Sequence, residues 1–294
     1  MSFEGTFTPI VTPFRADGSI DLRALGDLVE WQIDSRIDGL VPCGSTGESA
    51  TLSPDEHVSV IRHVVEVAAG RVPVIAGTGS NSTREAIEFT LHARDLGADG
   101  ALLISPYYNK PTQDGIFLHY RKIAEDTGFP LIVYNIPGRT ASRIEPETLA
   151  RLSRVANIVG LKESGADLVK TAETIAQSEP SFVVLSGDDA LTLPMLSIGA
   201  RGVISTVANV APQQTASIVR AYLGGDLARA RAVHYELLPL MQALFIETNP
   251  IPVKETMALM GMIEPEFRLP MCRMSEANRA RLSAVLEPFG LVKR

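Results

Sequence analysis

The sequence predicts an α/β fold, a closed (β/α)₈ barrel followed by a C-terminal helical extension. Short apolar, β-branched runs recur at intervals of roughly two to three dozen residues, and each is followed by a segment of helical periodicity. Polar and glycine-rich residues follow many of these runs. With 294 residues, 45% of them hydrophobic and 21% charged, the chain has ordinary globular composition and enough length to bury a large core.

Eight apolar runs are the predicted strands. They read as continuously apolar rather than alternating, which is typical of parallel strands buried on both faces. Eight such units could also form an open, doubly wound sheet. Polar residues after many different strands favour loops that converge on one mouth, so we predict a TIM barrel. In chain order the runs cover residues 6–11, 39–43, 72–76, 101–105, 131–135, 158–162, 182–186 and 202–206.

Helices are expected where capping residues precede apolar stripes. Ser53, followed by Pro54 and with Glu56 three residues on, forms a predicted capping box with proline at the first helical position. Further along, apolar residues at 86, 89, 93 and 96 keep the spacing of one helix face. Gly97 follows them as a predicted left-handed helix stop.

After the eighth strand the sequence predicts three more helices that have no strands to pair with. They cover residues 227–245, 252–260 and 275–286. Because no linker or low-complexity tract separates them from the barrel, we expect them to pack on it. The predicted division is a barrel at 1–224 and a C-terminal helical extension at 225–294.

Composition also limits the classes of partner. The formal net charge is -7 and no basic stripe for nucleic acid occurs. No stretch reaches ~20 uninterrupted apolar residues, so we expect neither a membrane span nor membrane partners. Cys43 and Cys272 are far apart, which predicts no disulfide framework, and a cytoplasmic location fits.

The five histidines predict no metal site. His57, His63, His92, His119 and His234 lack a ligand spacing such as His-Glu-x-x-His. Most fall on predicted helices, where we expect exposed positions.

Lys162 ends the sixth strand run, where a barrel places its active site. An ammonium buried among apolar residues is costly, so the side chain is expected either to be paired or to act as a free amine nucleophile. From this residue alone, pairing with a nearby carboxylate is an equally good interpretation.

Tyr134 and Arg139 belong to the run Tyr-Asn-Ile-Pro-Gly-Arg-Thr, which starts at the end of the fifth predicted strand and continues into the loop after it. A tyrosine there can transfer protons, and an arginine fork can bind a carboxylate. Taken singly, a packed tyrosine ring and a solvated arginine are the stronger interpretations.

Two further loops carry candidate groups. Residues 44–48 read Gly-Ser-Thr-Gly-Glu and offer adjacent hydroxyls and uncrowded amides that suit a carboxylate or a proton relay. This loop lacks the lysine of a nucleotide-binding P-loop, and Gly77-Thr78-Gly79 lacks the third glycine of a dinucleotide fingerprint. Tyr107 and Tyr108 follow the fourth strand, with aromatic packing as the alternative role.

Together, the 44–48 loop, the motif after strand five and the Gly-Leu-Lys-Glu of strand six resemble the dihydrodipicolinate synthase and N-acetylneuraminate lyase superfamily of pyruvate-dependent class I aldolases. The resemblance covers nearly the whole chain. It implies a lyase in which Lys162 binds pyruvate as a Schiff base, with no external cofactor. It also implies that Tyr134, Ser45 and Tyr108 form a proton relay, in which Tyr108 reaches a neighbouring subunit. The implied assembly is a homotetramer, a dimer of dimers.

Within the superfamily the sequence is most similar to the synthase branch. Arg139, residues 186–189 (Ser-Gly-Asp-Asp) and residues 249–254 (Asn-Pro-Ile-Pro-Val-Lys) carry that similarity. It implies condensation of pyruvate with L-aspartate 4-semialdehyde to 4-hydroxy-tetrahydrodipicolinate, in lysine and diaminopimelate biosynthesis. Thr46 and the backbone of Ile204 would bind pyruvate, and Arg139 the carboxylate of the semialdehyde.

Two departures from the synthase pattern leave alternatives open. Ser45 stands where synthases usually have threonine, and residues 163–167 read Glu-Ser-Gly-Ala-Asp rather than the more usual Glu-Ala-Ser/Thr-Gly. One alternative is an aldolase or dehydratase acting on a sugar-acid keto compound. Another is a catalytically silent binding barrel.

The resemblance also indicates a candidate effector site for L-lysine. Glu85 could bind its ammonium and Tyr107 its carboxylate. Against inhibition, Pro54 stands where inhibited relatives often have histidine. The alternative is that His57 is a solvated helix residue and Tyr107 a packing residue. The matching positions are Ala50, His57, Gly79, Asn81, Glu85 and Tyr107.

Overall fold

The computed structural model describes residues 3–292 and contains the predicted barrel. The predicted barrel at 1–224 and the predicted extension at 225–294 include residues 1, 2, 293 and 294, which lie outside the described residues. Eight parallel strands run in the order β2-β1-β8-β7-β6-β5-β4-β3, and a parallel bridge between Leu40 and Val74 joins the two ends of that order. The strands are β1 Gly5–Thr8, β2 Gly39–Leu40, β3 Ile75–Gly77, β4 Gly100–Ile104, β5 Leu131–Asn135, β6 Ile158–Glu163, β7 Val183–Ser186 and β8 Gly202–Ile204.

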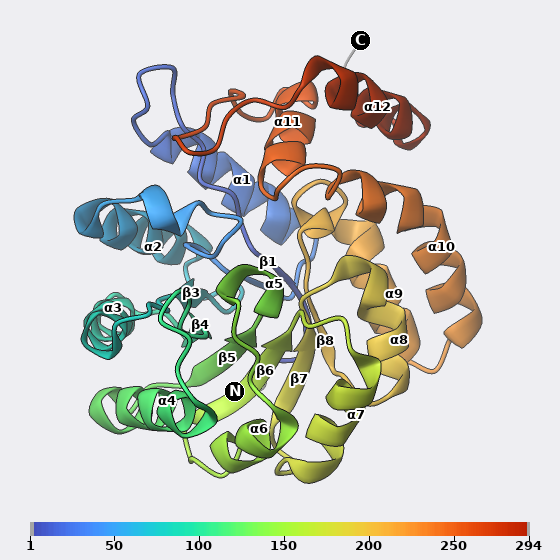
Figure 1. Ribbon diagram of the computed structural model, residues 1–294. Helices are drawn as coiled ribbons and strands as arrows, with labels where there is room; N and C mark the ends of the chain where they lie inside the picture. Colours follow the sequence, from blue (N-terminus) through green and yellow to red (C-terminus); the bar gives the residue numbers. More distant parts are fainter. Residues whose placement is uncertain (1–2, 293–294) are drawn as a thin grey trace.

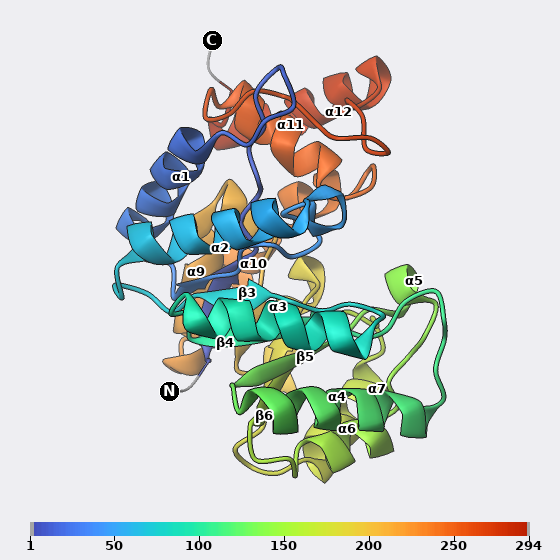
Figure 2. The same ribbon diagram turned by 90° about the vertical axis from the view of Figure 1, so that its left-hand side faces the viewer.

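Helices surround the barrel as an outer ring (Figure 1). From the side, α1, α2, α3, α4 and α6 lie one below another along the flank, with α11 and α12 above them (Figure 2). The helices are α1 Leu22–Asp34, α2 Pro54–Ala68, α3 Thr83–Asp95, α4 Gln113–Thr127, α5 Pro137–Thr140, α6 Pro146–Leu152, α7 Leu168–Gln177, α8 Thr192–Ser197, α9 Pro212–Leu223, α10 Leu227–Ala243, α11 Ile251–Leu259 and α12 Glu276–Leu286. The 3₁₀ turns are η1 Ser49–Thr51, η2 Asp189–Leu191, η3 Val207–Asn209 and η4 Glu287–Phe289.

Several strands are shorter than the apolar runs that predict them, for local backbone reasons. β1 ends before Pro9 and not at Val11, because proline has no N–H for the ladder. β2 ends at Leu40, before Pro42, and Cys43 has a left-handed φ of 56°. Pro73 likewise precedes the late start of β3.

The predicted helix ends are confirmed where capping residues marked them. The Ser53 hydroxyl accepts a hydrogen bond from the Glu56 amide, and the Glu56 carboxylate accepts one of 2.9 Å from the Ser53 amide. This capping box starts α2. Gly97 has a φ of 86° just beyond α3. The three helices after the barrel are α10, α11 and α12, each within two residues of its predicted limits.

The strands separate two buried apolar clusters. Side chains such as Phe7, Ile132 and Leu185 fill the barrel interior, and Tyr134 belongs to this inner cluster. A larger cluster lies between the strands and the surrounding helices. Filling the interior in this way leaves the polar chemistry to the loops at the carboxyl ends of the strands.

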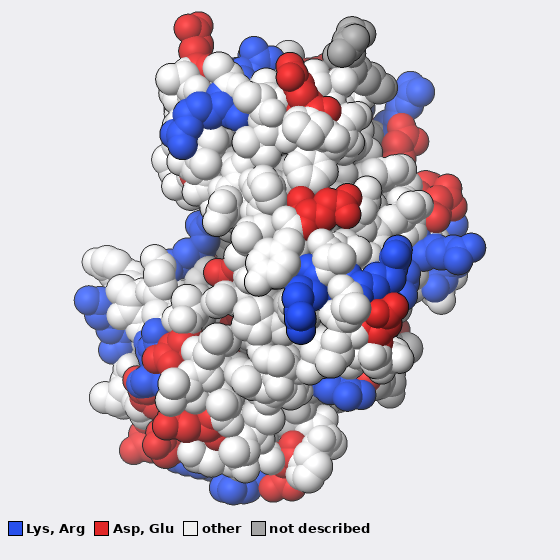
Figure 3. All heavy atoms as spheres, turned by 90° about the vertical axis from the view of Figure 1, so that its right-hand side faces the viewer, with Lys and Arg blue, Asp and Glu red and all other residues white. Residues whose placement is uncertain are grey.

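On the face shown in Figure 3, basic and acidic side chains are interspersed rather than gathered in a basic stripe. Within residues 3–292, no helix combines the length and apolar character that a membrane crossing requires.

The expectation of mostly exposed histidines is wrong. His57, His119 and His234 are each at most 6% exposed. Burial lowers the pKa of His119 from its usual 6.5 to about 4, which favours the uncharged ring. Among the described residues, no group of three or more His, Cys, Asp or Glu side chains is arranged to hold a metal ion.

Candidate active site

Lys162 and Tyr134 lie side by side on neighbouring strands. They are directly opposite in the register of β5 and β6, and each is 6% exposed. The Lys162 Nζ lies 4.2 Å from the centroid of the Tyr134 ring. No carboxylate of the described residues lies within 4.0 Å of this amine, so the interpretation of Lys162 as one half of an ion pair is wrong.

Gly187, after β7, gives the Lys162 side chain its space. A Cβ atom at this position would lie 2.9 Å from Lys162 Cε and 3.0 Å from Lys162 Cγ, and it would overlap the Ser164 hydroxyl. Real Cβ atoms almost never approach other atoms below 3.0 Å. The Ser-Gly-Asp-Asp run that the sequence singled out therefore contains a glycine required by the packing of Lys162.

We predict that Gly187→Ala lowers turnover by between about tenfold and 10²-fold, because a displacement of a reacting group by about 1 Å can cost the larger figure. Steady-state turnover measures the effect. Gly138→Ala is the matched control, since a Cβ there meets nothing within 4 Å. Equal rates for both variants would show that Lys162 tolerates the added methyl group.

The 44–48 loop presents its two hydroxyls differently. Ser45 is half-buried and lines the cavity at the barrel mouth, as Tyr134 does, but no hydrogen bond within 3.5 Å joins the two side chains. Thr46 is 3% exposed, and its Oγ1 accepts a 2.9 Å hydrogen bond from Asn249 Nδ2. Asn249 lies outside the barrel strands, and the sequence analysis did not assign it to the site.

Arg139 lies on α5 at the rim of the same cavity. Its side chain donates from Nη2 to the main-chain oxygen of Asn249 at 2.8 Å. The remaining guanidinium donors are free to bind a ligand, because this is the one hydrogen bond that Arg139 makes with its side chain among the described residues.

Tyr107 and Tyr108 have different surroundings. Tyr107 is 37% exposed and lines the cavity. Tyr108 is 89% exposed, has a left-handed φ of 69° and is absent from the cavity lining of its own chain. A non-glycine residue at positive φ with its ring in solvent is unusual in a packed loop. The structure thus does not bring Tyr108 to Lys162 within one chain.

Asp189, in η2, is a buried carboxylate that the sequence analysis did not assign individually. It is 2% exposed and accepts hydrogen bonds from the Ser205 hydroxyl and from the amides of Thr206 at 3.1 Å and Val207 at 3.3 Å. Burial raises the pKa of Asp189 from 3.8 to about 6, while these donors and the positive charge of Lys162 act in the opposite direction.

One cavity of about 490 Å³ unites most of the candidate residues at the carboxyl ends of the strands. Lys162 and Thr46 do not line it, and neither does Ile204. The Ile204 side chain is 1% exposed and packs in the inner cluster beside Tyr134. The cavity is lined by Ser45, Tyr134 and Arg139 and also by Ala50, His57, Gly79, Glu85 and Tyr107.

The candidate effector residues therefore lie on the same cavity, apart from Asn81, whose Nδ2 donates to the Tyr107 oxygen at 3.2 Å. The interpretation of His57 as a solvated residue is wrong. Its Nε2 donates to Gly77 O at 2.8 Å, and its Nδ1 has no partner among the described residues. Burial lowers the pKa of His57, so Nδ1 is an available acceptor. The Glu85 carboxylate accepts from the Ser80 hydroxyl.

Known proteins share this architecture along the whole chain. The model of the dihydrodipicolinate synthetase family matches residues 2–288. The chain belongs to the dihydrodipicolinate synthetase family. A family member from Nitratidesulfovibrio vulgaris (strain DP4), a 4-hydroxy-tetrahydrodipicolinate synthase, is 54% identical over 99% of this chain and 100% of its own.

Solved structures of family members agree. The crystal structure of the dihydrodipicolinate synthase from Aquifex aeolicus is 48% identical, with a TM-score of 0.97 over 99% of this chain and 100% of that one. A dihydrodipicolinate synthase from Acinetobacter baumannii, solved as a complex with pyruvate, is 42% identical with a TM-score of 0.97 over the same shares.

Proposed function

We infer that this chain is a pyruvate-dependent lyase that condenses pyruvate with L-aspartate 4-semialdehyde to 4-hydroxy-tetrahydrodipicolinate, in lysine and diaminopimelate biosynthesis. The observation that carries this function is 54% identity over 99% of the chain to a protein named for that reaction. The buried amine of Lys162, with no carboxylate within 4.0 Å among the described residues, supports Schiff-base chemistry. The sugar-acid and silent-barrel alternatives are correspondingly disfavoured.

In the proposed mechanism, the Lys162 amine attacks the keto carbon of pyruvate and water leaves, which gives an iminium. The iminium draws electron density from the methyl group, so a methyl proton is lost and an enamine forms. The enamine carbon then attacks the aldehyde of aspartate semialdehyde. Finally the amine of the new chain displaces Lys162 and closes the six-membered ring, so the enzyme amine is regenerated.

Tyr134 is proposed to move the protons of these steps through Ser45 to Tyr108 of a neighbouring subunit. The ring of Tyr134 beside Lys162 Nζ and the cavity shared with Ser45 support the first two members. The outward-facing Tyr108, 89% exposed, supports the third. A homotetramer, a dimer of dimers, is the assembly that we propose on this ground.

The two substrate carboxylates are proposed to bind at different groups. The pyruvate carboxylate is assigned to the amide and hydroxyl of Thr46, with the Ile204 backbone beside it. The semialdehyde carboxylate is assigned to Arg139, whose fork keeps free donors at the rim of the cavity. Cytoplasmic location and the division of the chain at residues 224 and 225 also stay proposals.

Coupled turnover with pyruvate and aspartate semialdehyde tests the proposed function. Trapping with borohydride in the presence of pyruvate tests its first step, because reduction of the imine leaves a stable pyruvate-derived mass on the protein. Turnover of a sugar-acid keto compound in place of the semialdehyde, in a panel of aldehydes and keto acids, would favour the first alternative. Absence of both turnover and trapping would favour the silent barrel.

We predict that Arg139→Ala raises the KM for aspartate semialdehyde much more than it affects pyruvate trapping. Loss of a charged hydrogen-bonding group typically removes about 1.5–3 kcal/mol of binding, or roughly 10- to 10²-fold. Arg143→Ala is a matched control in the same loop, since its guanidinium bonds the Gly165 oxygen. Equal losses of semialdehyde use and pyruvate trapping would instead give Arg139 a general structural role.

L-Lysine is proposed to inhibit this chain from the part of the cavity that Glu85, His57 and Tyr107 line. Inhibition would follow if the ammonium binds Glu85 and the bare Nδ1 of His57, with a coupling of about 1–3 kcal/mol, or 5- to 150-fold. Millimolar L-lysine added during turnover measures it, and Glu85→Ala should relieve it while Glu88→Ala, an exposed change on the same helix, should not. Unchanged turnover of the parent enzyme would remove this regulation and leave the catalytic proposal intact.

A further inference from the structure

The segment that joins α10 to α11 contacts the groups assigned to both substrates. Asn249 is 7% exposed and lies on the lining of the mouth cavity. Its side-chain amide donates to Thr46 Oγ1 at 2.9 Å, and its main-chain oxygen accepts from Arg139 at 2.8 Å. One residue of the C-terminal helical part thus connects the loop after β2 with the loop after β5.

The direction of the bond between Asn249 and Thr46 has a chemical consequence. A hydroxyl donates one hydrogen bond and accepts others. Since Asn249 Nδ2 supplies a donor, Thr46 keeps its own hydrogen, and it donates to no acceptor within residues 3–292. The Thr46 hydroxyl is therefore held as a donor toward a ligand, which is the role that a carboxylate requires.

Lys254 holds the other end of the same loop. It is fully buried, and its Nζ lies 2.5 Å from Oε1 of Glu48, a buried residue with a left-handed φ of 53° that ends the loop. The ammonium also donates to the Thr12 oxygen at 3.1 Å and lies 4.4 Å from the centroid of the Phe14 ring. Separating a buried charge from its partner costs much free energy. The position of Lys254 therefore fixes the position of Glu48.

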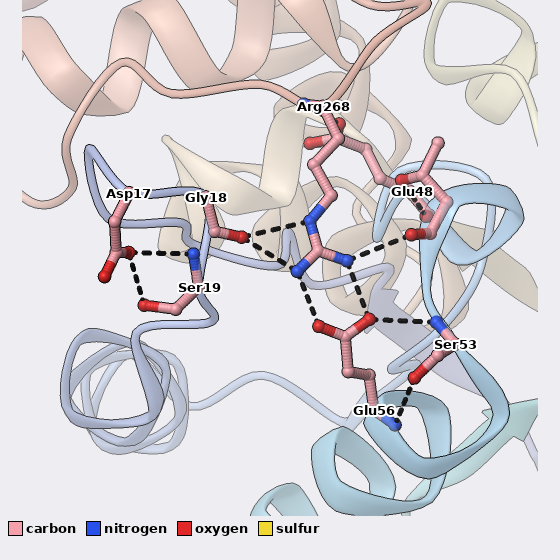
Figure 4. Close-up of polar contacts among 8 residues, drawn as sticks. Asp17, Gly18, Ser19, Glu48, Ser53, Glu56 and Arg268 are labelled. Carbon is pink, nitrogen blue, oxygen red and sulfur yellow. Dashed lines mark hydrogen bonds and ion pairs between the residues drawn. The ribbon is translucent and has the colours of Figure 1, made fainter.

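Arg268, a second cation of the C-terminal part, holds the chain on both sides of the 44–48 loop. Figure 4 shows the Arg268 guanidinium between Gly18 and Glu56. It binds the Glu56 carboxylate through two bonds of 2.6 and 2.7 Å, and it donates to the Gly18 oxygen at 2.8 Å and to the Thr51 oxygen at 3.0 Å. Glu56 also caps α2, so the chain on the far side of Glu48 is anchored as well.

We propose that Asn249 and Lys254 are positioning residues for pyruvate binding, through the hydrogen bond of Asn249 to Thr46 and the ion pair of Lys254 with Glu48. This inference rests on the proposed function, because it takes Thr46 as the group that receives the pyruvate carboxylate. It gives the C-terminal helical part a catalytic purpose: the barrel supplies the 44–48 loop, and residues 249 and 254 fix its conformation at both ends.

The proposed role of Asn249 predicts that its side chain affects the binding of pyruvate and not that of aspartate semialdehyde. Asn249→Ala removes the side-chain donor but keeps the main-chain oxygen that accepts from Arg139. The apparent affinity for pyruvate, measured from the concentration dependence of borohydride trapping, should fall about tenfold, since a net hydrogen bond to a ligand-orienting group is worth about that much. The KM for aspartate semialdehyde should change less than about threefold. Arg139→Ala should show the opposite pattern.

Matched variants separate positioning from stability. Asn157→Ala makes the same truncation at a half-buried amide that donates to the oxygens of Ala124 and Phe129, and it should leave pyruvate affinity unchanged. Thr46→Val combined with Asn249→Ala should weaken pyruvate binding no further than Thr46→Val alone, because the two residues act through one hydrogen bond. Additive losses, or parent-like affinity in Asn249→Ala, would overturn the Asn249 half of the proposal.

The Lys254 half is tested by loss and rescue. Lys254→Met leaves the buried Glu48 without its cationic partner, although the Arg268 amide still donates to its carboxylate. Pyruvate affinity should therefore fall about tenfold or more, together with the melting temperature. The pair Lys254→Gln with Glu48→Gln removes both charges but can keep a hydrogen bond, so it should recover most of the lost affinity. If Lys254→Met does not fold, this neutral pair is compared directly with Glu48→Gln alone, which should bind pyruvate more weakly than the pair. Equal or weaker binding by the pair would overturn the assignment.

Lys122→Met, on an exposed ion pair with Asp126, controls for loss of a lysine and should bind pyruvate as the parent does. Trapping by the parent enzyme distinguishes failure of the proposed function from failure of this inference. If the parent traps no pyruvate, the proposed function fails, and the inference that rests on it fails as well. If the parent traps pyruvate and the Asn249 and Lys254 variants bind it equally well, the proposed function stands and this inference fails.

Discussion

Lys162→Ala is expected to abolish pyruvate trapping and to lower turnover by on the order of 10⁴-fold or more, because removing the nucleophile of a covalent mechanism removes the intermediate itself. The chain contains other lysines, so the site of the trapped mass decides the assignment. Peptide mapping of the borohydride-treated parent should place the pyruvate-derived mass on Lys162 alone. The Lys162 side chain makes no hydrogen bond or ion pair among the described residues, so alanine leaves no buried polar partner behind and the fold should survive.

Two lysine variants control this experiment. Lys122→Ala removes an exposed lysine on α4 and should trap pyruvate as the parent does. Lys170→Ala removes one on α7 that pairs with Glu145 and should also trap normally. Trapping that persists in Lys162→Ala at the parent level would contradict the Schiff-base assignment, whatever the effect on turnover.

The sequence predicted the barrel because its strands are continuous apolar runs, which is a local property of each strand. The positions of the strand ends depend on less visible features. β1 was expected to reach Val11 and β2 to reach Cys43, but prolines and a left-handed residue end both early. The run Leu131–Asn135 was predicted with its observed limits, since no proline interrupts it.

The central pair of the site was predictable for a topological reason. Tyr134 and Lys162 each lie one residue before the end of a strand, and consecutive strands of a barrel are neighbours, so their proximity follows from the predicted fold. Asn249 could not be placed in the same way. It contacts Thr46 across 203 residues of sequence, through a connection between two helices whose packing no local pattern specifies.

The buried histidines were mispredicted because helix periodicity does not say how wide the buried face is. His57 lies on α2, where its ring packs 4.5 Å from Phe89 of α3 and bonds a carbonyl oxygen of the barrel. Such a contact depends on how neighbouring helices pack. The role of Gly187 was likewise hidden, because it depends on where the Lys162 side chain of another strand passes.

Tyr134→Phe is expected to keep the fold and to lower turnover by about 10²- to 10⁴-fold, the range that a positioned proton-transfer group supplies. The variant is a sharp test because phenylalanine retains the ring that lies 4.2 Å from Lys162 Nζ. Packing around the amine is therefore kept, and only the hydroxyl is lost. Pyruvate trapping should slow, since imine formation needs proton transfer, yet the final trapped mass should still reach one per chain.

Tyr120→Phe is the matched control for the loss of a buried phenol. Its ring is fully buried, and its hydroxyl donates to the Leu103 oxygen at 3.0 Å on the outer side of the barrel. Losing that bond should destabilise the fold by about 1 kcal/mol, because the Leu103 oxygen loses a partner, while turnover stays at the parent level. If Tyr134→Phe instead resembles Tyr120→Phe, with a lower melting temperature and normal turnover, Tyr134 packs against Lys162 without transferring its protons, and another group must serve the Schiff base.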